Sequence, residues 1–343
     1  MERAECWGEA SRNHGIGKGG CWGEVTGRKP DIDDREGSWE GSQGVSPSMS
    51  IIERVAKPEY WYQPGQMLRR ILRRGPLPEV AEVVSPWGLP MRVRPTEMVG
   101  HAMYHLGVLD LAPCEVAWRL LEPGETAIDV GANIGVFSGL LARRAGPSGE
   151  VFSLEPHPRI HAELARHVGE WGRMGIPMAK IRLISVAASD KAGEAELYEP
   201  EGFDNNAGSA SLEQTGSGTS HRVQTDRLER LVPRGRKFGV VKIDTEGHEP
   251  AVFKGAGAML TDGTFRDIVF EEHGTPPTET TRILLDAGYR LFFIGRTFRG
   301  PKLTPPDERS TLPQWLPPNY LATRDPERAL SRCQAAGWNV LRG

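Results

Sequence analysis

The chain has 343 residues, of which 38% are hydrophobic, and a formal net charge of −3. This size can bury a core for one large α/β domain with extensions or for two modest domains. The small net charge gives no electrostatic reason to expect a nucleic-acid partner. Four scattered cysteines without a C-x-x-C pair indicate neither a disulfide framework nor a zinc site. Because no apolar run approaches 18 residues and no signal-peptide core is present, we expect a reduced, cytoplasmic protein with no integral membrane segment.

The N-terminal third is predicted to contain a tail and a cap. Residues 1–48 are rich in glycine, serine and charge and almost lack aliphatic residues, which predicts a disordered tail. Whether this tail belongs to the native protein stays open. Residues 49–123 predict a cap that covers a cofactor mouth or shapes an acceptor site. Its predicted elements are a basic helix at 60–74, strands at 80–84 and 91–93, and helices at 97–106 and 114–121.

Strand and helix patterns alternate over residues 124–325, which predicts a doubly wound, mostly parallel sheet of seven strands. A hairpin insertion over 193–225 interrupts the alternation, and residues 326–343 contain a closing helix. The predicted strands are 126–130, 150–154, 181–186, 240–244, 267–273, 289–294 and 319–323, and the predicted helices between them are 135–145, 158–170 and 277–287.

A glycine-rich turn follows the first of these strands, in the run D-V-G-A-N-I-G at 129–135. Gly131 and Gly135 allow the backbone to bend sharply and to approach a ligand closely. The helix that follows is expected to present free N–H groups to a negatively charged group. The second strand ends at Glu155, an acid of the type that binds a ribose diol. Together these features predict a nucleoside pocket at the carboxyl edge of the sheet.

The turn departs from the two common nucleotide motifs. A dinucleotide site requires G-x-G-x-x-G, but Asn133 and Val136 occupy the second and third glycine positions. A nicotinamide-dependent oxidoreductase is therefore disfavoured. No Gly-Lys-Ser/Thr follows the turn, which excludes a P-loop.

A charged loop at 239–249, G-V-V-K-I-D-T-E-G-H-E, completes the pattern. With D-V-G-A-N-I-G, the Glu155-Pro156 step and A-A-S-D at 187–190, it resembles the FkbM-type S-adenosylmethionine-dependent methyltransferases over roughly residues 78–324. The resemblance implies a Rossmann-like class I fold, S-adenosylmethionine as cofactor, and methylation of a hydroxyl on a sugar or secondary metabolite. It does not identify the small-molecule acceptor, and N-methylation and oligomeric state stay open.

The resemblance also implies cofactor contacts. The glycine turn would face the methionine part, Glu155 the ribose, and the end of the third strand the adenine. Asp190 would accept from an exocyclic amine, although a surface turn explains Asp190 almost equally well. The implied cofactor residues are Asp129, Gly131, Asn133, Gly135, Glu155, Ala187 and Asp190, with Val186 near the ring.

Methylation of a hydroxyl needs a base, because a neutral alcohol is a poor nucleophile. We favour Asp244 as the central carboxylate and His248 as the proton acceptor, since the pKa of histidine lies close to working pH. Lys242 shares a strand face with Asp244 and should keep it ionised. Glu246 and Glu249 are read either as catalytic acids or as acids at a helix start, and the second reading is better for Glu249. The remaining candidates are Glu271 and His273.

Two further possibilities stay open. Asp244, Glu271 and Glu272 could hold Mg²⁺, but adjacent strand residues point to opposite faces, so a metal is not favoured. Residues 204–211 are either a mobile lid over the acceptor or a solvated loop. The main competing function is a non-catalytic protein that binds S-adenosylmethionine in the same fold.

Overall fold

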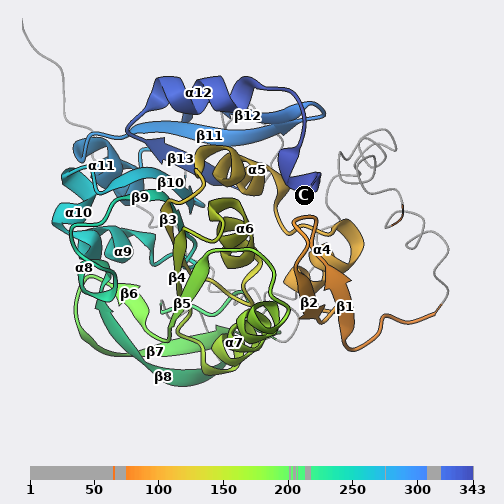
Figure 1. The fold of residues 1–343 in the computed structure, drawn as a ribbon. Coiled ribbons are helices and arrows are strands. Elements are labelled where there is room, and N and C mark those ends of the chain that lie inside the picture. The colour runs from red at the N-terminus through yellow and green to blue at the C-terminus, as the bar shows by residue number, and fades with distance from the viewer. Residues whose placement is uncertain are drawn as a thin grey trace, which may run out of the picture. The chain divides into compact units, whose positions relative to one another are not determined.

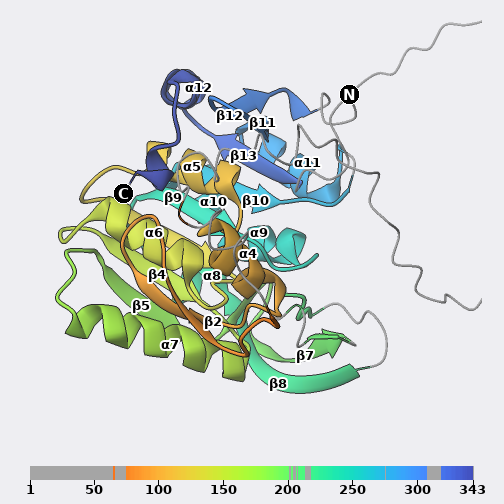
Figure 2. The same cartoon turned by 90° about the vertical axis from the view of Figure 1, so that its right-hand side faces the viewer.

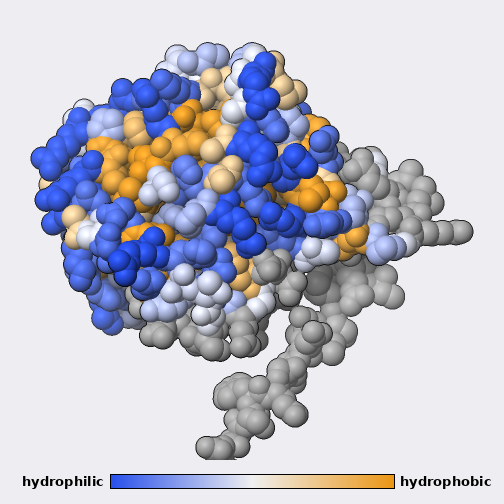
Figure 3. Space-filling view, turned by 90° about the horizontal axis from the view of Figure 1, so that it is seen from below, coloured by the Kyte–Doolittle hydropathy of each residue, from blue (hydrophilic) through white to orange (hydrophobic). Residues whose placement is uncertain are grey.

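The computed structural model describes residues 65, 75–200, 202–203, 206, 208–212, 218–274, 276–306 and 318–342. The predicted tail at 1–48 and, except for Gly65, the predicted basic helix at 60–74 lie outside these residues. None of the helices described is long and apolar enough to cross a membrane. The face shown in Figure 3 carries orange apolar patches between blue hydrophilic residues.

The centre of the fold is an eight-stranded sheet of order β12-β11-β13-β10-β9-β3-β4-β5 (Figure 1). Five neighbouring strands, from β10 to β5 in this order, are parallel, and β13 lies antiparallel between β10 and β11. This arrangement confirms the doubly wound, mostly parallel, Rossmann-like prediction. The seven predicted strands are β3 (Thr126–Val130), β4 (Glu150–Leu154), β5 (Lys180–Ile184), β9 (Phe238–Ile243), β10 (Phe265–Glu271), β11 (Arg290–Thr297) and β13 (Asn319–Thr323).

The eighth strand was not predicted. It is the edge strand β12 (Gly300–Thr304), which begins a proline-rich stretch and lies antiparallel to β11. Pro301 is compatible with this position, because a strand at the edge of a sheet leaves one row of backbone groups without ladder partners.

Two helical layers cover the two faces of the sheet (Figures 1 and 2). Successive strand residues alternate between the layers: Ala127 and Val240 pack on one side, Ile128 and Val241 on the other. The first layer contains α5 (Leu111–Leu120), α6 (Val136–Ala145), α7 (Pro158–Arg173), α12 (Pro326–Gln334) and the short η3 (Asn339–Leu341). The second contains α8 (Leu228–Leu231), α9 (Glu249–Ala256), α10 (Ala258–Thr261) and α11 (Glu279–Asp286).

The N-terminal elements pack on the first layer. The predicted strand pair is present as the ribbon β1 (Ala81–Val84) and β2 (Pro90–Val93), and α4 (Met98–Leu106) follows. Trp171 Nε1 of α7 donates to the carbonyl of Pro90 at 2.7 Å, and Arg92 N donates to His167 Nε2 at 3.0 Å. These bonds join the ribbon to α7.

The predicted insertion is a hairpin of β7 (Gly193–Pro200) and β8 (Gly218–Arg227). The third parallel strand ends at Ile184 instead of residue 186. Residues Ala187–Ser189 form β6, which pairs with β8 in a separate three-stranded sheet of order β6-β8-β7. The end of the third strand is therefore joined to the insertion.

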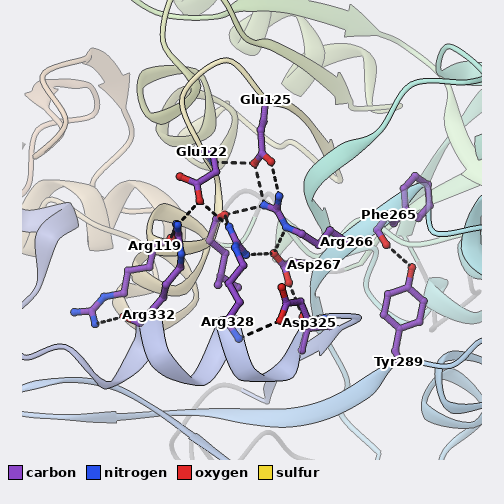
Figure 4. A network of polar contacts seen from close by, with 12 residues as sticks. Arg119, Glu122, Glu125, Phe265, Arg266, Asp267, Tyr289, Asp325, Arg328 and Arg332 are labelled. Carbon is purple, nitrogen blue, oxygen red and sulfur yellow. Dashed lines mark hydrogen bonds and ion pairs between the residues drawn. The ribbon is translucent and has the colours of Figure 1, made fainter.

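An ion network joins α12 to the sheet (Figure 4). The Asp267 side chain is fully buried and accepts from Arg266 Nε at 2.9 Å, Arg328 Nη1 at 3.0 Å and Thr323 Oγ1 at 2.6 Å. Burial raises the pKa of Asp267, while these donors oppose the rise. This network lies among elements of the first layer and the sheet.

Candidate functional site

A cavity of about 530 Å³ lies where β3, β4, β9 and β10 end. Since carboxyl ends of parallel strands meet at one edge, side chains that follow different strands converge there. Among the predicted site residues, those that line the cavity are Gly131, Asn133, Glu155, Val186, Ala187, Lys242, Asp244, Glu246, His248, Glu271 and His273.

The glycine turn between β3 and α6 passes very close to the loop after β9. Gly131 has a φ of 75°, and a Cβ there would come closer to the carbonyl oxygen of Asp244 than the 3.0 Å that real Cβ atoms keep. Asn133 also adopts a left-handed conformation, with a φ of 49°. The close approach and the positive φ together require glycine at position 131.

The amides of residues 131–135 are each bonded within the protein, so this turn has no free N–H group ahead of α6, which begins at Val136. The acceptors are the carbonyls of Leu154 and Ala132 and the side chains of Glu155 and Asn133. The carbonyl of Gly131 in turn accepts from Lys242 Nζ at 3.1 Å. These amides cannot cradle a pyrophosphate, which counts further against a dinucleotide site.

Glu155 is fixed at the end of β4. Its Oε2 accepts from Asn133 N at 2.9 Å and its Oε1 from His157 N at 2.9 Å. Burial raises the pKa of Glu155 to about 7, against the effect of these two hydrogen bonds. The carboxylate therefore presents a rigid acceptor edge to the cavity.

Lys242 and Asp244 share a strand face, as predicted. Lys242 Nζ lies 3.1 Å from Asp244 Oδ2 and 3.8 Å from Asp129 Oδ1. Burial alone would lower the pKa of Lys242, but the two carboxylates outweigh burial and raise it. The lysine is therefore a fixed cation between the glycine turn and the loop after β9.

Two predicted cofactor residues support the turn from behind and do not line the cavity. Asp129 is fully buried, and its Oδ2 accepts from Ser138 Oγ at 2.6 Å. Gly135 faces α7, where a Cβ would lie 2.6 Å from Leu164 Cδ1. Both residues set the shape of the turn.

Glu246 has unusual backbone and electrostatic properties. Its φ of 52° is left-handed, and Ser211 Oγ from the insertion donates to its carbonyl at 2.9 Å. Burial, together with repulsion from Asp244 and Glu249, raises the pKa of Glu246 to about 7. Backbone strain and a perturbed carboxyl in one cavity residue are typical of functional sites.

Glu249 has the supporting role that its position at a helix start predicted. Its Oε1 accepts from Thr245 N at 2.7 Å and its Oε2 from Gly247 N at 3.1 Å. These bonds hold the loop between β9 and α9 in shape, and Glu249 itself does not line the cavity.

The acids after β10 diverge. Burial and the neighbouring Asp244 raise the pKa of Glu271, and His273 Nε2 lies 3.2 Å from its Oε1. Glu272 instead accepts from Gly274 N and Thr278 Oγ1, both at 2.7 Å. Because the strand continues through Glu271, the next side chain leaves the site. The structure thus does not assemble the three-carboxylate Mg²⁺ site considered from the sequence.

His248 and Asp190 lie at the β6 side of the site. His248 Nε2 is 3.0 Å from Ser189 Oγ, which also donates to Asp190 Oδ1 at 3.3 Å. Asp190 is exposed and does not line the cavity, so the structure does not bring it to the predicted adenine position. The surface-turn interpretation describes Asp190 better.

Two further walls of the cavity come from the predicted cap at 49–123 and from the segment around 204–211, for which the sequence left two readings open. One is the apolar wall of α4 and α5, and the other is the segment between β7 and β8. The amphipathic pattern of α4 and α5 was visible, but it does not say which cavity the helices face. The walls comprise Met98, Val99, Ala102, Leu109, Pro113 and Cys114, and Asn206, Gly208, Ala210 and Leu212.

Comparisons with known proteins agree with this geometry. The family model described as the methyltransferase FkbM domain matches residues 129–291. The hexuronic acid methyltransferase AglP of Haloferax volcanii is 28% identical over 248 residues, covering 70% of this chain and 90% of that protein.

Two solved structures are also similar. The methyltransferase FkbM of Methylobacillus flagellatus has a TM-score of 0.38 at 14% identity over 58% of this chain; the match spans only 43% of that protein's chain. An S-adenosylmethionine-dependent O-methyltransferase of Thermotoga maritima has a TM-score of 0.39 at 13% identity, over 75% of this chain and 80% of that one.

Proposed function

Residues 129–291 belong to the FkbM-type methyltransferases, and from this premise we propose that the protein methylates a hydroxyl oxygen of a sugar or secondary metabolite, with S-adenosylmethionine as donor. One observation carries the proposal. The glycine turn and Glu155 line the same cavity as Glu246 and Glu271, two acids with raised pKa values.

The cavity fits a positively charged nucleoside. Its lining includes Glu155, Asp244, Glu246 and Glu271, while Lys242 is already paired with two carboxylates. S-adenosylmethionine carries a sulfonium and an ammonium against one carboxylate, so its net charge is complementary to this lining. When bound, it supplies an electrophilic methyl carbon, and its sulfur keeps the electron pair of the broken carbon–sulfur bond.

Individual residues would hold different parts of the donor. Glu155 would accept from the ribose hydroxyls, and the turn at Gly131 and Asn133 would lie along the methionine part. Val186 and Ala187 are small or medium apolar residues that would contact the adenine. Asp129 and Gly135 would act only through the shape of the turn.

We assign proton removal to Glu246. Its pKa of about 7 matches the working range of a general base, and a cation in the cavity would lower this pKa and favour the ionised form. As the acceptor oxygen bonds to the methyl carbon, its proton passes to the Glu246 carboxylate. Asp244, held by Lys242, would orient the acceptor hydroxyl.

His248 remains the second candidate for the base. Its contact with Ser189 places the imidazole beside β6, near the residues proposed for the adenine. If Nε2 donates to Ser189, Nδ1 is the basic nitrogen. Because His248 lies on the adenine side of the proposed site, Glu246 is the better candidate for the base that removes the proton.

A sugar or another hydroxylated compound suits the remaining walls. The wall of α4 and α5 is mainly apolar, and Asn319 and Asp110, which share a hydrogen bond of 2.7 Å, add polar groups beside it. A cavity with an apolar wall and few polar groups can bind a ring face and orient its hydroxyls. The relative from Haloferax, named for hexuronic acid, makes a uronic acid the first acceptor to test.

Transfer of a radioactive methyl group tests the proposal. We expect the protein to bind S-adenosylmethionine but not NAD in calorimetry, and to label hydroxylated small molecules from a panel of sugars and metabolite extracts. Glu246→Gln should keep cofactor binding and lose transfer. Binding without any labelled product would favour the non-catalytic alternative, and binding of NAD alone would refute the proposal.

A further inference from the structure

Three side chains that do not line the cavity converge near the loop end of the β7–β8 hairpin. His157 lies in the loop between β4 and α7, Glu199 on β7 and His221 on β8. One ligand atom from each lies within 4.8 Å of the other two. His157 Nε2 is 2.7 Å and His221 Nε2 is 3.0 Å from the same oxygen, Oε1 of Glu199.

The fold fixes this convergence. In the β7–β8 register, His221 is opposite Leu197 and Glu199 is opposite Thr219, so Glu199 and His221 lie on one face of the hairpin. His157 precedes α7 and is held by Phe203, whose ring stacks on the imidazole at a centroid distance of 5.1 Å. The loop before α7 and the two strands of the hairpin therefore present their ligand atoms to one point.

We propose that His157, Glu199 and His221 form a binding site for a divalent transition metal of the zinc type. Two imidazole nitrogens and one carboxylate oxygen are a known ligand set for Zn²⁺, with a fourth position left for water. The His157 side chain is only 2% exposed, so this ligand is held in the protein interior. The His221 side chain is 35% exposed, so a metal ion can enter the site from solvent beside it.

Metal binding requires small rearrangements. Ligand atoms around tetrahedral zinc are about 3.3 Å apart for bonds of about 2.0 Å, so the Glu199 oxygen must withdraw slightly from both imidazoles. Coordination by Nε2 puts the proton of His157 on Nδ1, which now accepts from Ile160 N at 3.4 Å. That contact is long for a hydrogen bond but caps the start of α7, so metal binding must offset the loss of this cap.

The site would connect the insertion to the cofactor pocket. His157 N donates to Glu155 Oε1, and the insertion supplies Ser211 to the carbonyl of Glu246. A metal at this point would tie the hairpin to the loop that carries Glu155. Because the ligands converge only in the folded chain, a bound ion should stabilise the fold.

The test uses the full chain after treatment with a chelator and desalting. Zn²⁺ is titrated by calorimetry, and Co²⁺ is followed through the visible absorption of a tetrahedral site. We expect one equivalent of Zn²⁺, a Co²⁺ spectrum with bound nitrogen ligands, and a rise in the melting temperature. Glu199→Gln should lower the affinity for this Zn²⁺ ion at least about tenfold, as expected for loss of a ligand.

Glu196→Gln is the matched control, because Glu196 lies on the same strand and bonds the exposed Ser220 at 2.9 Å. It should bind metal as the unaltered protein does. His221→Ala is the second variant and should lose the same equivalent while keeping the circular dichroism spectrum of the metal-free protein. Equal affinity in Glu199→Gln and Glu196→Gln, or full binding by His221→Ala, would show that the three residues form only a hydrogen-bonded clasp and would overturn the proposal.

Discussion

The α-carbon of Gly131 faces the carbonyl oxygen of Asp244 so closely that no side chain fits between them. Asp244 N also donates to the carbonyl of Val130 at 3.1 Å. The turn proposed for the cofactor and the loop proposed for catalysis are therefore in direct backbone contact. A displacement of either segment must displace the other.

Gly131→Ala should disrupt both segments. The new Cβ overlaps the Asp244 carbonyl, and alanine is strained at a φ of 75°, so we expect S-adenosylmethionine affinity to fall at least about tenfold and stability to fall by more than about 2 kcal/mol. Calorimetry and thermal unfolding measure these effects. Gly235→Ala is the control, because Gly235 has the same φ with no atom within 4 Å of its Cβ position. It should show only the strain, about 1–2 kcal/mol, with normal binding.

Lys242→Met should destabilise the protein by about 3–5 kcal/mol, because it leaves the carboxylates of Asp129 and Asp244 without their shared cation. Chemical denaturation measures the change. Adding Asp129→Asn should restore part of the loss, since it removes the more deeply buried charge. Lys237→Met, which removes a surface lysine bonded to the Gly263 carbonyl, should stay within about 0.5 kcal/mol. No rescue by Asp129→Asn would contradict the ion-pair explanation.

Glu246→Gln should lower kcat by about 10²–10⁴-fold while leaving S-adenosylmethionine binding intact. In the unaltered protein, kcat/KM should rise with pH through about 7, because the base acts only after it loses its proton. Glu194→Gln, on the exposed hairpin, should keep the normal rate and profile. A profile unchanged in Glu246→Gln, with substantial activity left, would transfer the role to His248.

The raised pKa of the Glu246 carboxyl also predicts that the stability of the fold depends on pH. The pKa of Glu246 in the folded protein, about 7, is above its ordinary value of 4.5. Its contribution to stability is therefore complete below pH 4.5 and is lost as pH rises through about 7. Glu246→Gln should melt at a higher temperature than the unaltered protein at pH 8, and at a similar temperature at pH 4.5. Equal melting temperatures at pH 8 would argue against a buried, strained carboxylate.

Asp267→Ala should destabilise the fold without weakening cofactor binding. It leaves Arg266 and Arg328 without their common buried partner, and we expect a loss of about 3–5 kcal/mol in denaturant unfolding. Asp286→Ala, at an exposed position of α11, should change stability by less than about 0.5 kcal/mol. A large change in S-adenosylmethionine affinity for Asp267→Ala would show coupling between this network and the cavity.

The sequence predicted the elements whose signal is local. The strands that became β3, β4 and β13 show apolar runs bounded by turn residues, and their bounds agree with the structure. The pair Lys242 and Asp244 followed from the two-residue period of a strand. Strand β12 was not predicted because it contains Pro301. Proline usually marks a connection, and the sequence alone does not tell which strand is at the edge of a sheet.

The placements in the site that the sequence did not settle have a different origin. Whether Asp190 and Glu272 point into the cavity depends on where β6 and β10 end and on which partners lie nearby, namely Ser189 for one and Thr278 for the other. The cavity walls at 98–114 and 206–212 come from segments distant in sequence from the motifs. Such placement is decided by tertiary packing, which local periodicity does not report.

The bond from Ser211 to Glu246 has an evolutionary consequence. The hairpin that shapes one wall also braces the residue proposed to remove the proton. Replacing this hairpin to admit a new substrate would thus disturb the reaction machinery at the same time. Descendants with altered selectivity should retain a hydroxyl at position 211 or acquire another brace for the left-handed residue, and grafted hairpins that lack one should yield poor catalysts whatever they bind.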